Sequence, residues 1–243
     1  MKVFFPISLL VLSWNFLKAQ DTIYYDKNWN KISKEKAFEH YDVITHDEID
    51  TVKANVKRYR NDNSILSDLN YSNYSKKTKD GIYREWYKNQ QLKEEINYKE
   101  GKLNEKLTTF WSNGQLKRDD VYIEDSLIQG KVFDDKGIET EYFDFFIPAT
   151  FPGGKEALVK FITSVTLYPR YCRKNNIEGE VTVKFIVEKD GKVTNVKVTD
   201  SIHELLDKES IKVVKLMPHW APAKQDGETV RSYFMLPIRF QIE

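Results

Sequence analysis

The side chains that most often carry out chemistry, histidine and cysteine, are few and scattered in this sequence. The histidines are His40, His46, His203 and His219. The nearest two stand six residues apart, which does not put them on one face of a helix, and none has a second ligand at the spacing of a metal site. Surface or structural roles are the better interpretation. The only cysteine, Cys172, is expected to be a buried, inert thiol in a short helix.

Other chemical signatures are also weak. The sequence has no glycine-rich phosphate loop and no Gly-x-Ser-x-Gly elbow, and Gly153-Gly154 suits the turn before a helix better than an anion site. Asp119-Asp120 and Asp134-Asp135 fall at predicted turns, where solvated loops explain them better than a glycosidase pair or a Ca²⁺ site. Trp86 and Trp111 could bind a sugar or a peptide, although packing in a repeat core is favoured. We therefore expect a binding protein, not an enzyme, with no cofactor and no metal.

Length and composition narrow the class of protein. The chain has 243 residues, which gives room for one large or two modest domains. Its formal net charge of +1 argues against a nucleic-acid partner, because nucleic-acid-binding domains are usually clearly basic. The aromatic content of 14% favours β-rich structure.

Residues 1–19 have the pattern of a signal peptide. Lys2 gives the positive start, a mainly apolar stretch follows, and Ala19 precedes a polar segment. We expect export to the periplasm or cell envelope with cleavage after Ala19. The alternative is an uncleaved inner-membrane anchor, although the stretch is shorter than the ~20 residues of a spanning helix.

The last third of the chain has the clearest secondary-structure pattern. Residues 181–187 alternate as a strand with one apolar face, and Asp190-Gly191 marks the hairpin turn that follows. Residues 201–217 read mostly as a helix, which begins either at a Ser201–Glu204 capping box or nearer Leu206.

A final strand is expected over residues 230–242. Its two faces alternate, with Phe234, Leu236, Ile238, Phe240 and Ile242 on one side and Tyr233, Met235, Arg239 and Gln241 on the other. The whole block predicts a small antiparallel sheet with helices packed on one face.

These residues resemble the C-terminal domain of TonB-type energy transducers, in the version common in Bacteroidetes. The matching positions are Tyr168-Pro169, Gly179, Val181, Phe185, Asp190-Gly191, Leu206-Asp207, Pro218, Trp220, Pro222 and Leu236-Pro237-Ile238-Arg239-Phe240. Phe151-Pro152-Gly153-Gly154 extends the likeness backwards, so the domain is expected over residues 150–243.

The resemblance implies a binding site on the last strand. In that family the strand pairs with the TonB box, an extended peptide of an outer-membrane TonB-dependent receptor, by β-augmentation. The matching edge here is Val230, Arg231, Ser232, Tyr233, Phe234, Met235 and Leu236. Arg231, Tyr233 and Met235 are expected to face away from the core, and Pro237 to interrupt pairing. A bare edge, or pairing with a second copy as a homodimer, is the alternative.

Residues 51–141 repeat themselves. Residues 86–93 align with residues 110–117, and the register carries Tyr98 onto Tyr122, which gives a period of 24 residues. A degraded copy follows around Phe133 and Gly137, and an earlier one is expected around Asn70-Tyr71. Each unit reads as a β-hairpin, and the pattern resembles MORN-like (YwqK-type) repeats, which implies a β-sheet platform.

The remaining segments connect these parts. Residues 20–50 read as a polar lead-in with a short helix near residues 33–40, and the domain boundary is expected near residues 141–149. The expected fold class is thus α+β, a hairpin-repeat sheet followed by a TonB-like domain.

Two functions follow from this organisation. The first is peptide binding in TonB-dependent transmembrane transport. The alternative is a periplasmic scaffold that binds another envelope protein, or cell-wall glycan, through its repeats, without transmitting force.

Overall fold

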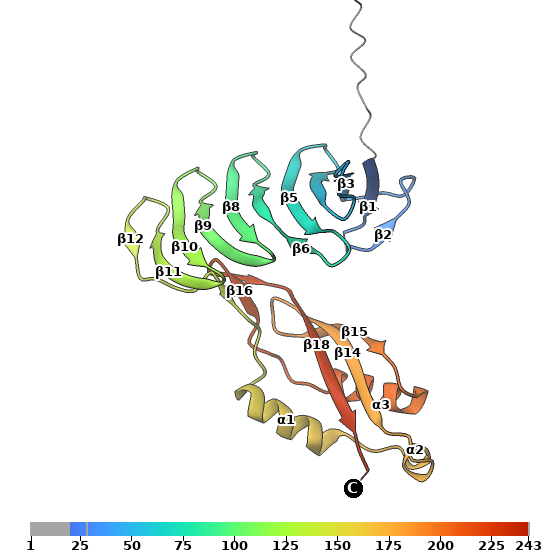
Figure 1. Cartoon of the computed structure of the whole chain (residues 1–243). Coiled ribbons are helices and arrows are strands. Elements are labelled where there is room, and N and C mark those ends of the chain that lie inside the picture. The colour runs from blue at the N-terminus through green and yellow to red at the C-terminus, as the bar shows by residue number, and fades with distance from the viewer. Residues whose placement is uncertain (1–19, 28, 243) are drawn as a thin grey trace, which may run out of the picture. The chain divides into compact units, whose positions relative to one another are not determined.

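The computed structural model describes residues 20–27 and 29–242. The expected signal peptide lies outside the described residues. The chain divides into two compact units, and the boundary in the sequence falls between Tyr142 and Phe143 (Figure 1). Among the described residues, no helix is both long and apolar enough to cross a lipid bilayer.

The N-terminal unit is built on one antiparallel sheet of 12 strands. The strands are β1 (Gln20–Tyr25), β2 (Lys31–Ile32), β3 (His40–His46), β4 (Ala54–Arg60), β5 (Ile65–Asn73), β6 (Thr78–Lys79), β7 (Gly81–Trp86), β8 (Leu92–Lys99), β9 (Lys102–Phe110), β10 (Leu116–Ile123), β11 (Ser126–Phe133) and β12 (Glu139–Thr140). Their order is β12-β11-β10-β9-β8-β7-β5-β4-β3-β1-β2, with β6 paired to β5, so neighbours in sequence are mostly neighbours in the sheet.

The sheet begins earlier than the sequence pattern indicated. Residues 20–50 were expected as a polar lead-in, but they contribute β1, β2 and β3. The helix expected near residues 33–40 is wrong, because that stretch forms turns between β2 and β3. In β3 the alternate residues Asp42 and Ile44 are buried, and Arg58 of the neighbouring strand pairs with Asp42. The polar composition concealed this strand because one of its buried positions is a carboxylate.

One turn recurs along this sheet. In Tyr87–Gln91 the first amide donates to the carbonyl of the fifth residue, and the fourth amide donates back to the first carbonyl. Arg60–Ser64, Trp111–Gln115 and Asp134–Ile138 repeat both hydrogen bonds. The fourth residue has a positive φ in each, and in Arg60–Ser64 this residue is Asn63. The turn therefore recurs in the structure, and the 24-residue period inferred from the sequence holds between the turns at Tyr87 and Trp111.

Neighbouring turns are tied together in the same repeating way. The Tyr87 hydroxyl donates to the Phe110 carbonyl, and the Trp111 indole donates to the Phe133 carbonyl one repeat later. Both side chains are half-buried, which agrees with packing inside the repeat for Trp111. Lys117 adds its ammonium over the Trp111 ring at 4.5 Å from the centroid.

Charged groups lie inside the last repeat. Arg118 and Asp120 of β10 are both fully buried, and Arg118 Nη1 donates to Asp120 Oδ2 at 2.8 Å. The sequence interpretation of Asp119-Asp120 as a solvated turn is thus wrong, since the strand alternation turns Asp120 into the buried face. Gly130 makes room there, because a Cβ at that position would lie 2.4 Å from the Tyr142 ring.

The described residues of the C-terminal unit form two three-stranded sheets, one larger and one with shorter strands, and three helices. Its elements are β13 (Phe146–Ile147), α1 (Gly154–Val165), α2 (Arg170–Lys174), β14 (Gly179–Val187), β15 (Val193–Asp200), α3 (Glu204–Lys215), β16 (Ala223–Gln225), β17 (Glu228–Val230) and β18 (Ser232–Phe240). The larger sheet is antiparallel in the order β15-β14-β18, and the smaller one runs β13-β16-β17.

Apolar side chains from β14 and α3 form the centre of this unit. Val181, Val183, Phe185 and Val187 are each 0% exposed, which confirms the alternation inferred from the sequence. The hairpin turn at Asp190-Gly191 is confirmed as well, with Gly191 at φ +83°. A Cβ on Gly191 would lie 2.0 Å from the Trp220 carbonyl oxygen, so only glycine lets this turn approach the 217–222 segment.

Helix α3 starts between the two positions considered from the sequence. Its N-cap is His203, whose Nδ1 accepts from the Leu205 amide at 3.1 Å. Ser201 is engaged elsewhere, because its hydroxyl donates to Asp207. A neutral imidazole nitrogen can accept a hydrogen bond as the usual capping oxygens do. The sequence analysis did not predict this N-cap because histidine is not among the preferred N-cap residues.

Candidate peptide-binding edge

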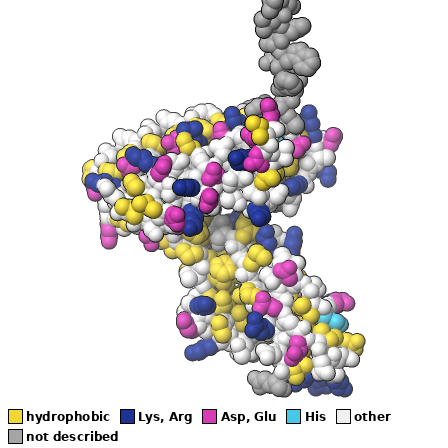
Figure 2. All heavy atoms as spheres, in the orientation of Figure 1, with side chains coloured by type: hydrophobic (Ala, Val, Ile, Leu, Met, Phe, Trp, Pro, Cys, Tyr) yellow, Lys and Arg dark blue, Asp and Glu magenta, His cyan; other side chains and the backbone are white. Residues whose placement is uncertain are grey.

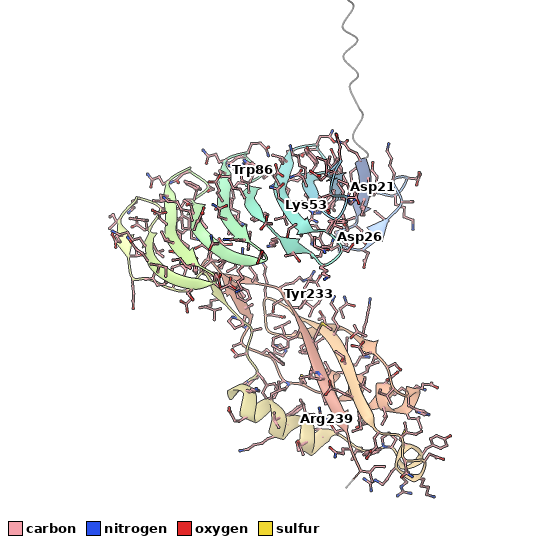
Figure 3. All side chains as sticks on the ribbon, viewed as in Figure 1. Asp21, Asp26, Lys53, Trp86, Tyr233 and Arg239 are labelled. Atoms are coloured by element: carbon pink, nitrogen blue, oxygen red, sulfur yellow. The ribbon has the colours of Figure 1, made fainter. Side chains whose placement is uncertain are left out.

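Strand β18 forms one edge of the three-stranded sheet. It pairs with β14 in a regular register of nine residue pairs, from Ser232 opposite Val187 to Phe240 opposite Gly179. No other described strand pairs with β18. Figure 3 marks Tyr233 near the start of this strand and Arg239 near its end.

The register decides which backbone groups of β18 face outward. The Glu188 amide donates to Lys192 in the hairpin turn, so Glu188 directs its backbone toward β15. Alternation then directs the backbone groups of Ile186 toward β15 as well, and away from its partner Tyr233. The N–H and C=O of Tyr233 therefore point to the free edge, and those of Met235 and Arg239 follow by the period of two.

Pro237 fits this pattern. It stands opposite Thr182, in the set of pairs whose backbone groups do not bond to each other. Its missing N–H is consequently lost from the free edge and not from the ladder with β14. The edge thus offers complete donor and acceptor pairs at Tyr233 and Met235, and then an interruption, as the sequence predicted.

The side chains of β18 alternate between core and solvent. Leu236, Ile238 and Phe240 are buried, whereas Tyr233 and Met235 are each 58% exposed. Lys184 of β14 places its ammonium 4.9 Å from the centroid of the Tyr233 ring. The outward face next to the free edge therefore offers an aromatic ring, a thioether and a cation.

The N-terminal limit of the expected edge needs correction. Val230 belongs to β17 and pairs with Ala223 in the smaller sheet, and β18 begins only at Ser232. Arg231 lies between the strands and donates to both carboxylate oxygens of Glu188, at 2.9 and 2.8 Å. These hydrogen bonds lower the pKa of the Glu188 carboxyl. The structure thus brings Ser232 to Leu236 together on one edge, and gives Arg231 a partner 43 residues away that no local pattern could reveal.

The opposite edge of the sheet is less regular. The β14–β15 register shifts twice, and Asn195 within β15 has a positive φ. Such irregularities disrupt the even spacing of donors and acceptors that an added strand needs. Of the two edges, β18 is therefore the better template.

The residues with catalytic potential are separate from this edge and have structural contacts. Cys172 is fully buried with its Sγ 3.6 Å from His203 Nδ1. His40 stacks on Trp29 at 4.5 Å, and burial lowers its pKa. His219 Nδ1 lies 3.2 Å from the Asp190 carbonyl oxygen. Among the described residues, no three His, Cys, Asp or Glu side chains gather as a metal site would require.

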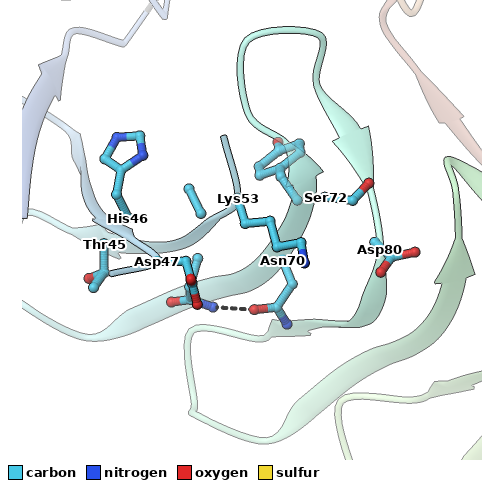
Figure 4. A pocket seen from close by; sticks show the side chains of 10 residues that line it. Thr45, His46, Asp47, Lys53, Asn70, Ser72 and Asp80 are labelled. Carbon is cyan, nitrogen blue, oxygen red and sulfur yellow. Dashed lines mark hydrogen bonds between the residues drawn. The ribbon is translucent and has the colours of Figure 1, made fainter. Parts of the chain in front are cut away.

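A polar pocket of about 320 Å³ lies in the N-terminal unit, at the ends of β3, β4 and β5 (Figure 4). Its lining consists of Thr45, His46, Asp47, Lys53, Ala54, Asn55, Asn70, Tyr71, Ser72 and Asp80. Several of these groups already bond within the chain: Asn55 donates to Asn70, and Asp80 accepts from the Glu100 amide. The sequence analysis missed this pocket because its residues come from separate strands and loops.

Comparison with known proteins identifies the domain that carries the edge. The family model for the Gram-negative bacterial TonB protein C-terminal matches residues 165–242. The likeness to the TonB C-terminal domain family is confined to these residues. Strands β14, β15 and β18 and helix α3 lie within the matched residues, whereas α1 lies almost entirely ahead of them.

Two relatives are TonB proteins of Helicobacter pylori. The chain is 34% identical to Protein TonB of strain J99 and 32% identical to that of strain 26695, in each case over 97 residues and 38% of this chain. The chain spans about a third of the length of these curated relatives (33%). Two NMR solution structures of the Helicobacter pylori TonB C-terminal domain also match. They cover 38% and 35% of this chain and 87% and 90% of theirs, at 25% and 27% identity, with TM-scores of 0.29 and 0.27.

Proposed function

We propose that the C-terminal unit binds an extended peptide of an outer-membrane TonB-dependent receptor along the edge of β18, as part of TonB-dependent transport across the cell envelope. The observation that carries this proposal is the free edge of β18, with outward N–H and C=O groups at Tyr233 and Met235, in a domain homologous to TonB. Backbone hydrogen bonds supply the affinity of such a complex, and side chains near the edge supply selectivity.

A proline at Tyr233 tests the edge directly. Tyr233→Pro removes the outward N–H without removing any donor from the ladder with β14. We expect at least a tenfold weaker affinity for synthetic peptides from receptor N-terminal segments, because one backbone hydrogen bond is lost and the ring of proline crowds the edge, about 1.4 kcal/mol or more. Isothermal titration calorimetry with the full chain measures it.

Tyr233→Ala is the matched control. It removes the same ring but keeps the N–H, so a smaller loss is expected than for Tyr233→Pro. Circular dichroism and amide exchange of β14 establish that both variants retain the fold. Unchanged peptide affinity in a folded Tyr233→Pro variant would show that the peptide does not pair with β18.

We propose a cell-envelope location on the strength of the TonB homology, and a binding role without catalysis. The sequence-based expectation of a cleaved signal peptide is tested by mass spectrometry of the mature N-terminus. A start at Gln20 in the soluble periplasmic fraction would leave an adaptor role, whereas an intact N-terminus in the inner-membrane fraction supports an energy transducer.

The second candidate function uses the N-terminal unit as a scaffold of MORN-like repeats. The observation that favours it is the polar pocket, whose amide, hydroxyl and carboxylate groups beside Tyr71 suit a glycan. Soluble cell-wall fragments provide the probe, and Asn70→Ala the test variant. Binding that persists without residues 151–243 assigns the interaction to the repeats, and binding lost with that deletion assigns it to the TonB domain.

A further inference from the structure

Helix α1 is packed differently from α3. Four residues of α3 are buried, among them Leu206 and Val213, whereas α1 has none, although its sequence is the more apolar. The apolar stripe of α1 is only half-buried against the core, and consists of Ala157, Leu158, Phe161, Ile162 and Val165. A helix of this character is expected to bury its stripe, so the exposure needs a cause.

Aromatic contacts link both ends of α1 to β18. Phe151, just before α1, contacts Trp220, and Trp220 contacts Phe234 near the start of β18, with ring centroids 5.6 and 4.8 Å apart. Tyr168, just after α1, contacts Phe240 at the end of β18 at 5.7 Å. The 12-residue helix, about 18 Å long, is close in length to the ~20 Å from Phe234 to Phe240.

The sheet is too narrow for both helices. Three strands about 4.8 Å apart offer a face little wider than one helix of about 10 Å diameter, and α3 occupies it by packing on β14 and β15. Helix α1 lies on the β18 side of the sheet, away from β15 (Figure 1), and its stripe is only partly covered. In Figure 2, viewed as in Figure 1, hydrophobic side chains are visible at the surface between α1 and β18.

One flank of α1 extends its apolar surface into solvent. Phe161 lies on the flank toward the core, where its ring contacts Phe151 at 5.5 Å. On the other flank Leu158 and Ile162 adjoin Val159, which is 55% exposed, at the ~100° per residue of a helix. The next residue, Lys160, lies on the polar side.

We propose that this flank of α1, formed by Leu158, Val159 and Ile162, is a shelf that selects the strand added to β18. The proposal rests on the proposed peptide binding at that edge. A strand paired with β18 extends the sheet by about 4.8 Å, over α1, and directs every second side chain toward the shelf. The backbone groups at the edge require an extended peptide. The shelf favours aliphatic residues at the peptide positions that face it.

The test uses two blocked synthetic peptides and the full chain. One alternates Thr and Val, and the other alternates Thr and Ser, so both offer the same backbone. Binding is followed by the ¹⁵N amide shifts of Tyr233 and Met235. We expect the Thr/Val peptide to bind at least about fivefold more tightly, because its valine side chains are removed from water when they pack on the shelf.

Val159→Gln is the test variant and Lys160→Gln its matched control, since both change exposed residues on adjacent positions. Val159→Gln is expected to reduce the preference for the Thr/Val peptide by about threefold or more, and to leave the Thr/Ser affinity unchanged. Lys160→Gln is expected to leave both affinities as they were. Leu158→Gln provides a second, stronger reduction where amide exchange shows an intact fold.

The outcomes separate the shelf from the edge. Equal binding of the two peptides, or equal effects of the two Gln variants, overturns the shelf and leaves the edge proposal intact. If neither peptide shifts the amide signals of Tyr233 and Met235, the edge proposal is overturned, and the shelf with it. Concentration-dependent shifts there without peptide, with a dimer in sedimentation, assign the edge to a second copy of the chain and overturn both.

Discussion

Replacing Arg118 by Met is expected to destabilise the N-terminal unit by about 3–5 kcal/mol, because it leaves the buried carboxylate of Asp120 without its cation. Arg118 and Asp120 are both 0% exposed. The Tyr142 and Tyr122 hydroxyls also donate to Asp120 Oδ2, at 3.2 and 3.4 Å. These neutral donors do not replace a full charge. Hydrogen exchange of the β10 and β11 amides measures the local loss.

The double variant Arg118→Met with Asp120→Leu is the control. Asp120→Leu removes the carboxylate that Arg118→Met leaves without its cation, so part of the lost stability should return. A loss below about 1 kcal/mol for Arg118→Met alone would mean that the pair is not isolated from solvent.

The same pair gives the unit a defined pH dependence. Burial raises the pKa of the Asp120 carboxyl, while the hydrogen bond and charge of Arg118 oppose that rise. A carboxyl whose pKa is raised in the folded state contributes stability below its unfolded pKa of about 3.9, and this contribution is lost as pH rises through the folded pKa.

Without Arg118 the pKa of Asp120 is expected to rise further. The deficit of Arg118→Met relative to the native chain should therefore be smaller at mildly acidic pH than at neutral pH. Unfolding midpoints in urea on both sides of this range give the comparison. Adding Asp120→Asn to Arg118→Met should make the stability deficit the same at both pH values. If the deficit of Arg118→Met alone does not depend on pH, titration of Asp120 is not its cause.

Replacing Trp220 by Ala is expected to cost the C-terminal unit about 3–5 kcal/mol. Its side chain is 3% exposed and joins three aromatic rings. Phe234 of β18 lies 4.8 Å from it, and Phe185 of β14 lies 5.7 Å away. Truncation opens a cavity beneath the start of β18. Thermal unfolding and amide exchange of β14 and β18 measure the effect.

Trp220→Phe is the matched variant for this prediction. The indole Nε1 has no hydrogen-bond partner among the described residues, so phenylalanine loses packing volume but no bond. We expect a cost of about 1–2 kcal/mol and peptide binding that is largely retained. Equal costs for Phe and Ala would mean that the ring contacts contribute little.

Short-range patterns in the sequence determined much of this protein. The period of two in residues 181–187 and 233–240, the Asp190-Gly191 turn and the 24-residue repeat all follow from neighbours in the chain. Strand and turn are fixed by backbone geometry within a few residues, and the repeat is visible as internal similarity, so these features could be predicted without a structure. The outward-facing pair Tyr233 and Met235 was found in this way.

Only the tertiary structure decided which of these elements meet. Arg231 pairs with Glu188, 43 residues earlier, and Asp120 is buried beside Arg118 and Tyr142. Residues 20–46 join the sheet through pairing, not through composition. The partial burial of the apolar stripe of α1 depends on the width of the sheet beside it, to which α1 itself contributes no strand. Such contacts join segments whose separation in the chain has no fixed period, and therefore only the fold itself reveals them.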